Sequence, residues 1–201
     1  MRQVSMPEER KIILASASPR RKEILGKTGL KFSVDAGDYK EDMDLALKPR
    51  QLARFLSSEK ARAVAVKYAS ALVIAADTFI VFQGSLLGKP HTREEARRML
   101  TLLNGRQHSV LTGFTVIDTR TGKKLSRSVE TKVFFKKMTG QEIESYVKTG
   151  EPLDKAGAYA IQGLGAVLVK KIEGDYFNVI GLPVASLAVT LKKFGISVLD
   201  R

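Results

Sequence analysis

The stretch SVLTGFTVIDTRTGKKLSRSVETKVFF, residues 109–135, decides the fold class. It predicts two long strands joined by a turn around Thr121-Gly122, because turn residues separate two segments that both contain β-branched and aromatic residues. Upstream, ALVIAADT (71–78) is a continuous apolar run, typical of a strand that is buried on both faces. KIILA (11–15) has the same character and is shorter. Because helical patterns separate these strands irregularly, we expect an α/β domain with a mixed sheet.

Helix signals lie between and after the strands. Ser18 is a candidate N-cap followed by Pro19, and the segment from 49 to about 68 repeats its apolar residues near a period of 3.6. Two capping boxes and a closing apolar segment predict the remaining helices: Thr92 with Glu95, Thr139 with Glu142, and 183–195. We expect strand at 31–37, strand, turn and a short segment over 79–90, and a glycine-punctuated strand over 157–174.

Composition limits the classes of function. The chain has 201 residues, 44% of them hydrophobic, which suits one core and a single domain. No apolar stretch reaches the roughly 20 residues of a membrane span, and the N-terminus lacks the apolar region of a secretory signal, so we expect a cytoplasmic protein without a membrane partner. Without cysteine, and with only His91 and His108, a bound metal would be a hard ion held by oxygen.

The formal net charge of +13 indicates an anionic partner, whether phosphate, nucleic acid or a membrane surface. The basic residues are scattered in pairs and are not interleaved with aromatic residues, which argues against single-stranded nucleic acid. Most of these pairs are more readily explained as solvated surface.

LASASPRRKEIL (14–25) is the strongest local signal, because it places two arginines where a strand becomes a helix. A helix N-terminus presents unpaired N–H groups and the positive end of the dipole, so it binds anions. Ser16 and Ser18 add hydroxyl donors, and Arg20 and Arg21 add guanidinium groups that suit phosphate oxygens. The alternative is a plain Ser18 cap beside surface arginines. We favour a polyphosphate site, since uncompensated positive charge at this end costs about 0.3–1 kcal/mol.

Three further residues are candidates for chemistry. Asp77, at the expected end of a buried strand, could hold a divalent cation or orient a water, or it could cap a turn. Lys60 lies on or beside the apolar face of its helix, where a lysine either reaches water or points into a cleft. Lys89, between a glycine and a proline, could neutralise a phosphate or simply be exposed.

Familiar nucleotide motifs are incomplete in this chain. GKPHT (88–92) lacks the spaced glycine and the Ser/Thr of a Walker A loop, and GLGA (163–166) lacks the third glycine of a dinucleotide fingerprint. No serine elbow or cysteine nucleophile is present. Phosphate donors together with carboxylates that suit a hard metal indicate phosphoryl or nucleotidyl chemistry.

Seven segments in order resemble the Maf family of nucleoside triphosphate pyrophosphatases: LASASPRRKEIL, EKARAVA, AADT, GKP, LNGRQHSVLTGF, EPLDKAGAYAIQGLGAVLV and EGDYFNVIGLP. The resemblance runs from Lys11 to the C-terminal helix, so residues 11–201 would form the domain and 1–10 an extension without a family counterpart. It implies an elongated mixed β-sheet flanked by helices, in two lobes with a central cleft, as in the Maf and ITPase-like folds. It also implies hydrolysis of a nucleoside triphosphate to monophosphate and pyrophosphate with Mg²⁺ or Mn²⁺, which removes unwanted nucleotides before they enter nucleic acid, and a homodimer.

The resemblance assigns roles to particular residues. Asp77 matches the catalytic aspartate, which activates water and contacts metal, and Glu41 matches a second metal ligand. The loop around Glu41 departs from the family wording, so Asp38 or Asp42 could take its place. The phosphate-binding cluster matches Ser16, Arg20, Arg21, Lys60 and Lys89.

Substrate choice follows from the same resemblance. AADT with IQG resembles the branch that prefers dTTP and UTP, whereas the 7-methyl-GTP branch typically has SDQ and IEG. Arg20, Thr78 and Gln162 match the specificity positions, and an amide such as that of Gln162 can bond both a donor and an acceptor on a pyrimidine. The alternatives are a pyrophosphatase for 7-methyl-GTP or another modified nucleotide, and a nucleic-acid-binding or protein-binding regulator of cell division.

Overall fold

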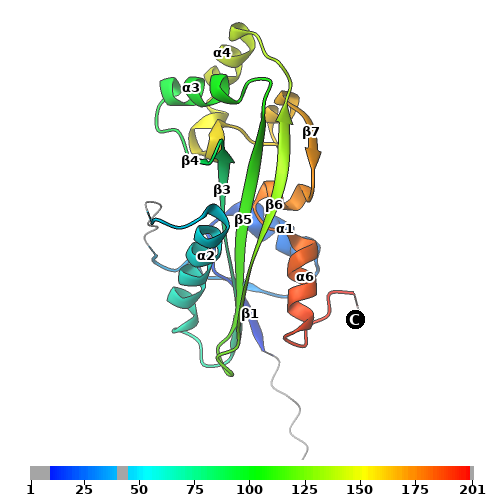
Figure 1. The fold of residues 1–201 in the computed structure, drawn as a ribbon. Coiled ribbons are helices and arrows are strands. Elements are labelled where there is room, and N and C mark those ends of the chain that lie inside the picture. Colours follow the sequence, from blue (N-terminus) through cyan, green and yellow to red (C-terminus); the bar gives the residue numbers. More distant parts are fainter. Residues whose placement is uncertain (1–9, 40–44, 200–201) are drawn as a thin grey trace, which may run out of the picture.

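The computed structural model describes residues 10–39 and 45–199, which form a seven-stranded mixed sheet with helices on both faces (Figure 1). The strands pair in the order β2-β1-β3-β5-β6-β7, and β4 pairs with one end of β3. β1 is parallel to β2 and β3, and the other pairs are antiparallel. The strands are β1 (Lys11–Leu14), β2 (Ser33–Val34), β3 (Ala71–Phe82), β4 (Ser85–Leu87), β5 (Gln107–Asp118), β6 (Lys124–Phe135) and β7 (Val169–Glu173).

The helices divide between the two ends of the long strands. α1 and α6 cover one face of the lower half in Figure 1, α2 covers the other face, and α3 and α4 pack at the upper end. The α-helices are α1 (Pro19–Lys27), α2 (Pro49–Ala65), α3 (Arg93–Leu103), α4 (Gly140–Lys148), α5 (Tyr176–Ile180) and α6 (Val184–Lys192). Three 3₁₀ helices are η1 (Glu151–Asp154), η2 (Ala156–Ala158) and η3 (Leu164–Leu168). Within the described ranges, no helix combines the length and apolar composition that crossing a membrane requires.

Three strands hold the two lobes together. β3, β5 and β6 each have 12 residues, so each extends about 40 Å at roughly 3.3 Å per residue. β3 and β5 stay in register from Leu72 opposite Asp118 to Val81 opposite Ser109. The expected elongated mixed sheet and its two lobes are therefore confirmed, and the 109–135 hairpin forms their connection.

The structure corrects two predictions of secondary structure. β3 does not end at Asp77-Thr78 but continues to Phe82, because β5 pairs with it on both sides of these polar residues. The segment 157–174 is mostly not strand: η2, a turn and η3 precede β7, which begins only at Val169. Gly157 has a φ of 67°, and a Cβ there would lie 2.3 Å from Ile80 Cδ1. Glycine is therefore required here because the backbone passes close to the Ile80 side chain, and it does not mark a strand.

The helix caps agree with the sequence in most details. Ser18 and Thr139 cap α1 and α4, and Glu142 completes the second capping box. At α3, Thr92 accepts from the Glu95 N–H, but the Glu95 carboxylate accepts from His91 N instead of closing the box. α5 was not predicted, although Asp175 is an ordinary N-cap for it.

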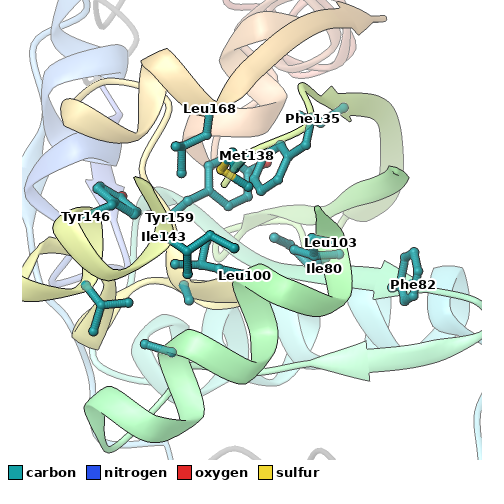
Figure 2. Close-up of a cluster of buried hydrophobic side chains, with 14 of the residues drawn as sticks. Ile80, Phe82, Leu100, Leu103, Phe135, Met138, Ile143, Tyr146, Tyr159 and Leu168 are labelled. Carbon is teal, nitrogen blue, oxygen red and sulfur yellow. The ribbon is translucent and has the colours of Figure 1, made fainter. Parts of the chain in front are cut away.

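Phe135 and Tyr159 lie in the core of the upper lobe (Figure 2), and the buried imidazole of His108 packs against both rings. His108 Nε2 lies 2.8 Å from the Tyr159 hydroxyl, and both rings make edge contacts with Phe135. His108 Nδ1 is buried and has no hydrogen-bond partner in the described structure. Burial lowers the pKa of His108 from 6.5 to about 4, so the imidazole is neutral in the folded protein near pH 7.

We therefore expect His108 to make stability depend on pH. The unfolded chain binds a proton at His108 near pH 6.5 and the folded chain only near pH 4, so stability is complete above pH 6.5 and decreases as pH falls toward 4. The total decrease is about 3 kcal/mol, at roughly 1.4 kcal/mol per pKa unit. Urea unfolding at several pH values should show a shallower decrease for His108→Gln, whereas exposed His91→Gln should follow the wild type. Parallel curves for all three proteins would contradict this assignment.

Candidate functional site

The site is defined by a gap in strand pairing along one side of β3, at residues 75–79, which we call the notch. β1 pairs with β3 only from Ala71 to Ile74, and β4 pairs with it only from Ile80 to Phe82. Within the described residues, no strand pairs with 75–79 on that edge. α1 begins just after β1 on one side of the notch, and the Gly88-Lys89 loop follows β4 on the other. Asp77 therefore lies in mid-strand, at the point where the neighbouring strand ends.

The serines before α1 shape its N-terminus. Ser18 Oγ accepts from Arg21 N at 3.4 Å, and Ser16 Oγ accepts from Ser18 N at 3.2 Å. Ser16 is buried, and Pro19 occupies the first helical turn, where no backbone donor is needed. This confirms the predicted strand-to-helix transition.

Arg21 joins three segments of the chain. Its Nε donates to Gly181 O at 2.9 Å, Nη1 to Ser16 Oγ at 3.2 Å and Nη2 to Thr78 Oγ1 at 3.1 Å. Gly181 has a φ of 119°, and a Cβ there would come within 3.5 Å of the guanidinium Nε. Arg21 therefore connects α1, β3 and the end of α5, a structural role that we did not predict.

Lys60 and Asp77 form an ion pair on the α2 face of the sheet. Their side chains are 15% and 7% exposed, so water screens the pair little. Gly113, opposite Asp77 on β5, lets α2 approach: a Cβ there would lie 2.0 Å from Ala53 O. Lys60 follows Ala53 by two helical turns and so projects from the same face of α2 toward β3. Lys60 thus points inward rather than into solvent.

A cleft of about 160 Å³ opens on the other face of the notch. Alternation along β3 places Thr78 on this face and Asp77 on the α2 face, so the two adjacent residues reach the notch from opposite sides. Five of the predicted substrate-binding residues line the cleft: Arg20, Arg21, Thr78, Lys89 and Gln162.

Arg20 and Lys89 differ from Arg21 in that neither makes a hydrogen bond or ion pair with the residues that the structure describes. Their charged groups are therefore available to an anion in the cleft. Guanidinium and ammonium groups are both suited to phosphate, the first as a planar fork and the second as a point charge.

Sequence reasoning missed part of this lining. Asp154, Lys155, Tyr159 and Ile161 all contribute to the cleft. Lys155 Nζ lies 2.8 Å from Asp154 Oδ2, and its hydrogen bond, with a smaller contribution from the Lys89 charge, lowers the pKa of the Asp154 carboxyl. These residues lie within EPLDKAGAYAIQG (151–163), which carries the family resemblance and in which the sequence assigned a role to Gln162 alone.

The predicted metal ligands are only partly described. Glu41 and Asp42 lie outside the described residues, and Asp38 is exposed. Elsewhere in the described chain, no group of three or more acidic or histidine side chains could hold a metal ion. Asp77 provides a carboxylate, but one of its oxygens contacts Lys60. Of the predicted ligands, the described residues therefore place only Asp77 at the notch, and they do not by themselves form a complete metal site.

The fold and the notch together define an α/β protein with a cleft between two lobes that is lined by arginine and lysine side chains. A family model described as Maf-like protein matches residues 11–194, and the chain belongs to this family. The chain is 51% identical over 193 residues to a Methanosarcina barkeri protein named dTTP/UTP pyrophosphatase, covering 96% of this chain and 98% of that protein. It is 48% identical to a Desulforamulus reducens protein of the same name, covering 94% and 99%.

A solved structure, that of the Staphylococcus aureus Ham1 protein, shares the architecture with a TM-score of 0.51. At 14% identity over 92% of this chain and 100% of that one, the likeness concerns the fold alone. It agrees with the expected ITPase-like arrangement.

Proposed function

We propose that this protein hydrolyses dTTP and UTP to the monophosphate and pyrophosphate. The notch carries the proposal, because it combines the Lys60–Asp77 pair with a cleft where Arg20 and Lys89 are available for phosphate. The names of the relatives support the choice of substrate, and Thr78 and Gln162 stand at the matching specificity positions. Removal of these nucleotides before incorporation into nucleic acid is the corresponding role.

The reaction forms a bond from a water oxygen to the α-phosphorus and breaks the bond from the α-phosphorus to the bridging oxygen of pyrophosphate. Asp77 would accept the proton of the attacking water, and Lys60 would hold its carboxylate in position. Arg20 and Lys89 would neutralise the charge that develops on the departing pyrophosphate. Ser16 would contribute through the N-terminus of α1, where its hydroxyl already orders the backbone.

A divalent cation, Mg²⁺ or Mn²⁺, belongs to this proposal. Asp77 would supply one ligand and Glu41 is the predicted second, with triphosphate oxygens as further ligands. When bound, the cation would offset negative charge on the triphosphate. Carboxylates and phosphates are the donor types that these ions prefer.

A nucleotide panel tests the proposal. With Mg²⁺ or Mn²⁺ present, dTTP and UTP should release pyrophosphate and no orthophosphate, and EDTA should stop the release. We expect kcat/KM for dTTP to exceed that for 7-methyl-GTP and dGTP by at least about tenfold, the scale of one well-placed hydrogen bond. Preference for 7-methyl-GTP would replace the substrate assignment. Absence of pyrophosphate from every triphosphate would overturn the enzymatic proposal.

A further inference from the structure

The carboxylate of Glu151 binds a segment that lies 13 and 14 residues further along the chain. Leu164 N donates to Oε2 at 2.9 Å, Gly165 N donates to Oε1 at 2.9 Å, and the Tyr146 hydroxyl donates to Oε1 at 2.8 Å. Hydrogen bonds to an ionised acceptor are stronger than neutral ones, so the two backbone bonds hold this segment firmly and the third connects Tyr146 to the same carboxylate. Glu151 itself does not line the cleft.

Tyr146 extends this arrangement to the other side of the same turn. Its hydroxyl accepts from Ala160 N at 3.2 Å while it donates to Glu151, and its ring is buried in the upper core (Figure 2). Gly163 N donates to Ala160 O at 3.1 Å, which closes a turn with Gln162 inside it. Glu151 and Tyr146 therefore fix the backbone before and after Gln162, although neither makes a hydrogen bond with its side chain.

The two glycines of IQGLG (161–165) permit this close approach. A Cβ on Gly163 would lie 2.3 Å from Glu151 Oε2, and one on Gly165 would lie 2.6 Å from the Tyr146 hydroxyl oxygen and 2.7 Å from Ala160 O. Side chains at these positions would displace the turn. The motif that does not fit a dinucleotide fingerprint is thus explained as the contact surface for a carboxylate and a phenol.

Gln162 lines the cleft, whereas Glu151 and Tyr146 lie behind the turn. We propose that Glu151, through Tyr146 and the backbone of residues 160–165, is a positioning residue that holds Gln162 against the nucleobase and so sets base selectivity. This inference rests on the proposed function, because it deepens the base preference of the same cleft. It assigns Glu151 no contact with the triphosphate.

The variant Glu151→Gln keeps the shape of the side chain but directs an amide donor at a backbone or hydroxyl donor. We expect KM for dTTP to rise about tenfold, the dTTP-to-dGTP ratio of kcat/KM to fall about tenfold, and kcat to change less than about threefold. Inhibition by inorganic tripolyphosphate should not change, since the phosphate site is intact. Tyr146→Phe, which keeps the buried ring and loses only the hydroxyl, should reproduce the loss of selectivity if Glu151→Gln folds poorly.

Glu142→Gln is the matched control, because Glu142 also accepts from a backbone N–H, that of Thr139 at 2.7 Å, but it lies at the start of α4 and makes no hydrogen bond with residues 160–165. It should lower stability without changing the dTTP-to-dGTP ratio. Gln162→Ala combined with Glu151→Gln should be no less selective than Gln162→Ala alone. An unchanged ratio in both Glu151→Gln and Tyr146→Phe would overturn the inference.

A second measurement separates this inference from the proposed function. If the wild type releases no pyrophosphate, the proposed hydrolysis fails, but the dissociation constants of dTTP and dGTP in EDTA still report base selectivity. A wild-type preference for dTTP that Glu151→Gln abolishes, with faster amide exchange at Leu164 and Gly165, would support the positioning role. Equal affinities in the wild type, or a preference that survives the substitution, would overturn it.

Discussion

Asp77→Asn is expected to lower kcat for dTTP hydrolysis by about 10²–10⁴-fold, the usual contribution of a positioned general base. The asparagine amide cannot accept the proton of the attacking water. Because asparagine and aspartate have nearly the same size, the shape of the cleft should not change. KM should change less, since Arg20 and Lys89 remain available to the phosphates. The rate of pyrophosphate release at saturating dTTP measures this effect, and turnover like that of the wild type would remove Asp77 from the catalytic role.

The same substitution should also affect stability. A one-atom change by itself suggests a small loss, but Asp77 is the ion-pair partner of the mostly buried Lys60 ammonium. Removing the carboxylate charge from beside this ammonium costs about 1–3 kcal/mol. Adding Lys60→Met to Asp77→Asn should partly restore the lost stability.

Asp118→Asn is the matched control. Asp118 is also a buried carboxylate with a cationic partner, Arg10 at 2.8 Å, but it lies at the far end of β5, opposite Leu72. It should lose comparable stability and keep kcat within about threefold of the wild type. Equal losses of kcat in the two variants would show that the effect of Asp77→Asn is structural.

Arg21→Met is expected to reduce both substrate affinity and stability. The guanidinium makes hydrogen bonds to Gly181 O, Ser16 Oγ and Thr78 Oγ1, and its loss removes all three together with a positive charge in the cleft. We expect kcat/KM for dTTP to fall about 10²–10³-fold, equivalent to one or two charge-assisted hydrogen bonds, and the free energy of unfolding to fall by about 1–3 kcal/mol. Steady-state kinetics and urea unfolding measure the two effects separately.

Arg20→Met provides the comparison, because Arg20 lines the same cleft without a hydrogen bond to the described residues. It should raise KM about tenfold and change the free energy of unfolding by less than about 0.5 kcal/mol, as for a surface substitution. If both variants unfold like the wild type, the connecting role of Arg21 is wrong. If neither changes KM, the cleft does not bind the triphosphate.

The arginines also show how far sequence reasoning extends. Positive charge at the N-terminus of α1 predicted an anion site, and Arg20 agrees with that interpretation. Adjacent Arg21 has the same local signal but is bonded to residues 57 and 160 positions away. No local pattern separates the two, because the difference depends on which side chain faces Gly181 after folding.

The sequence by itself determined the features that depend on neighbouring residues. These are the buried strands, the 109–135 hairpin, the Ser18 and Thr139 caps and the closing helix, since period, turn chemistry and capping are local. The tertiary structure decided the notch, the Lys60–Asp77 pair and the hydrogen bonds of Glu151 to the backbone that follows Gln162. Each of these depends on where a neighbouring strand ends or on a glycine that admits another segment, as Gly113 admits α2, and such contacts are defined only when distant parts of the chain pack together.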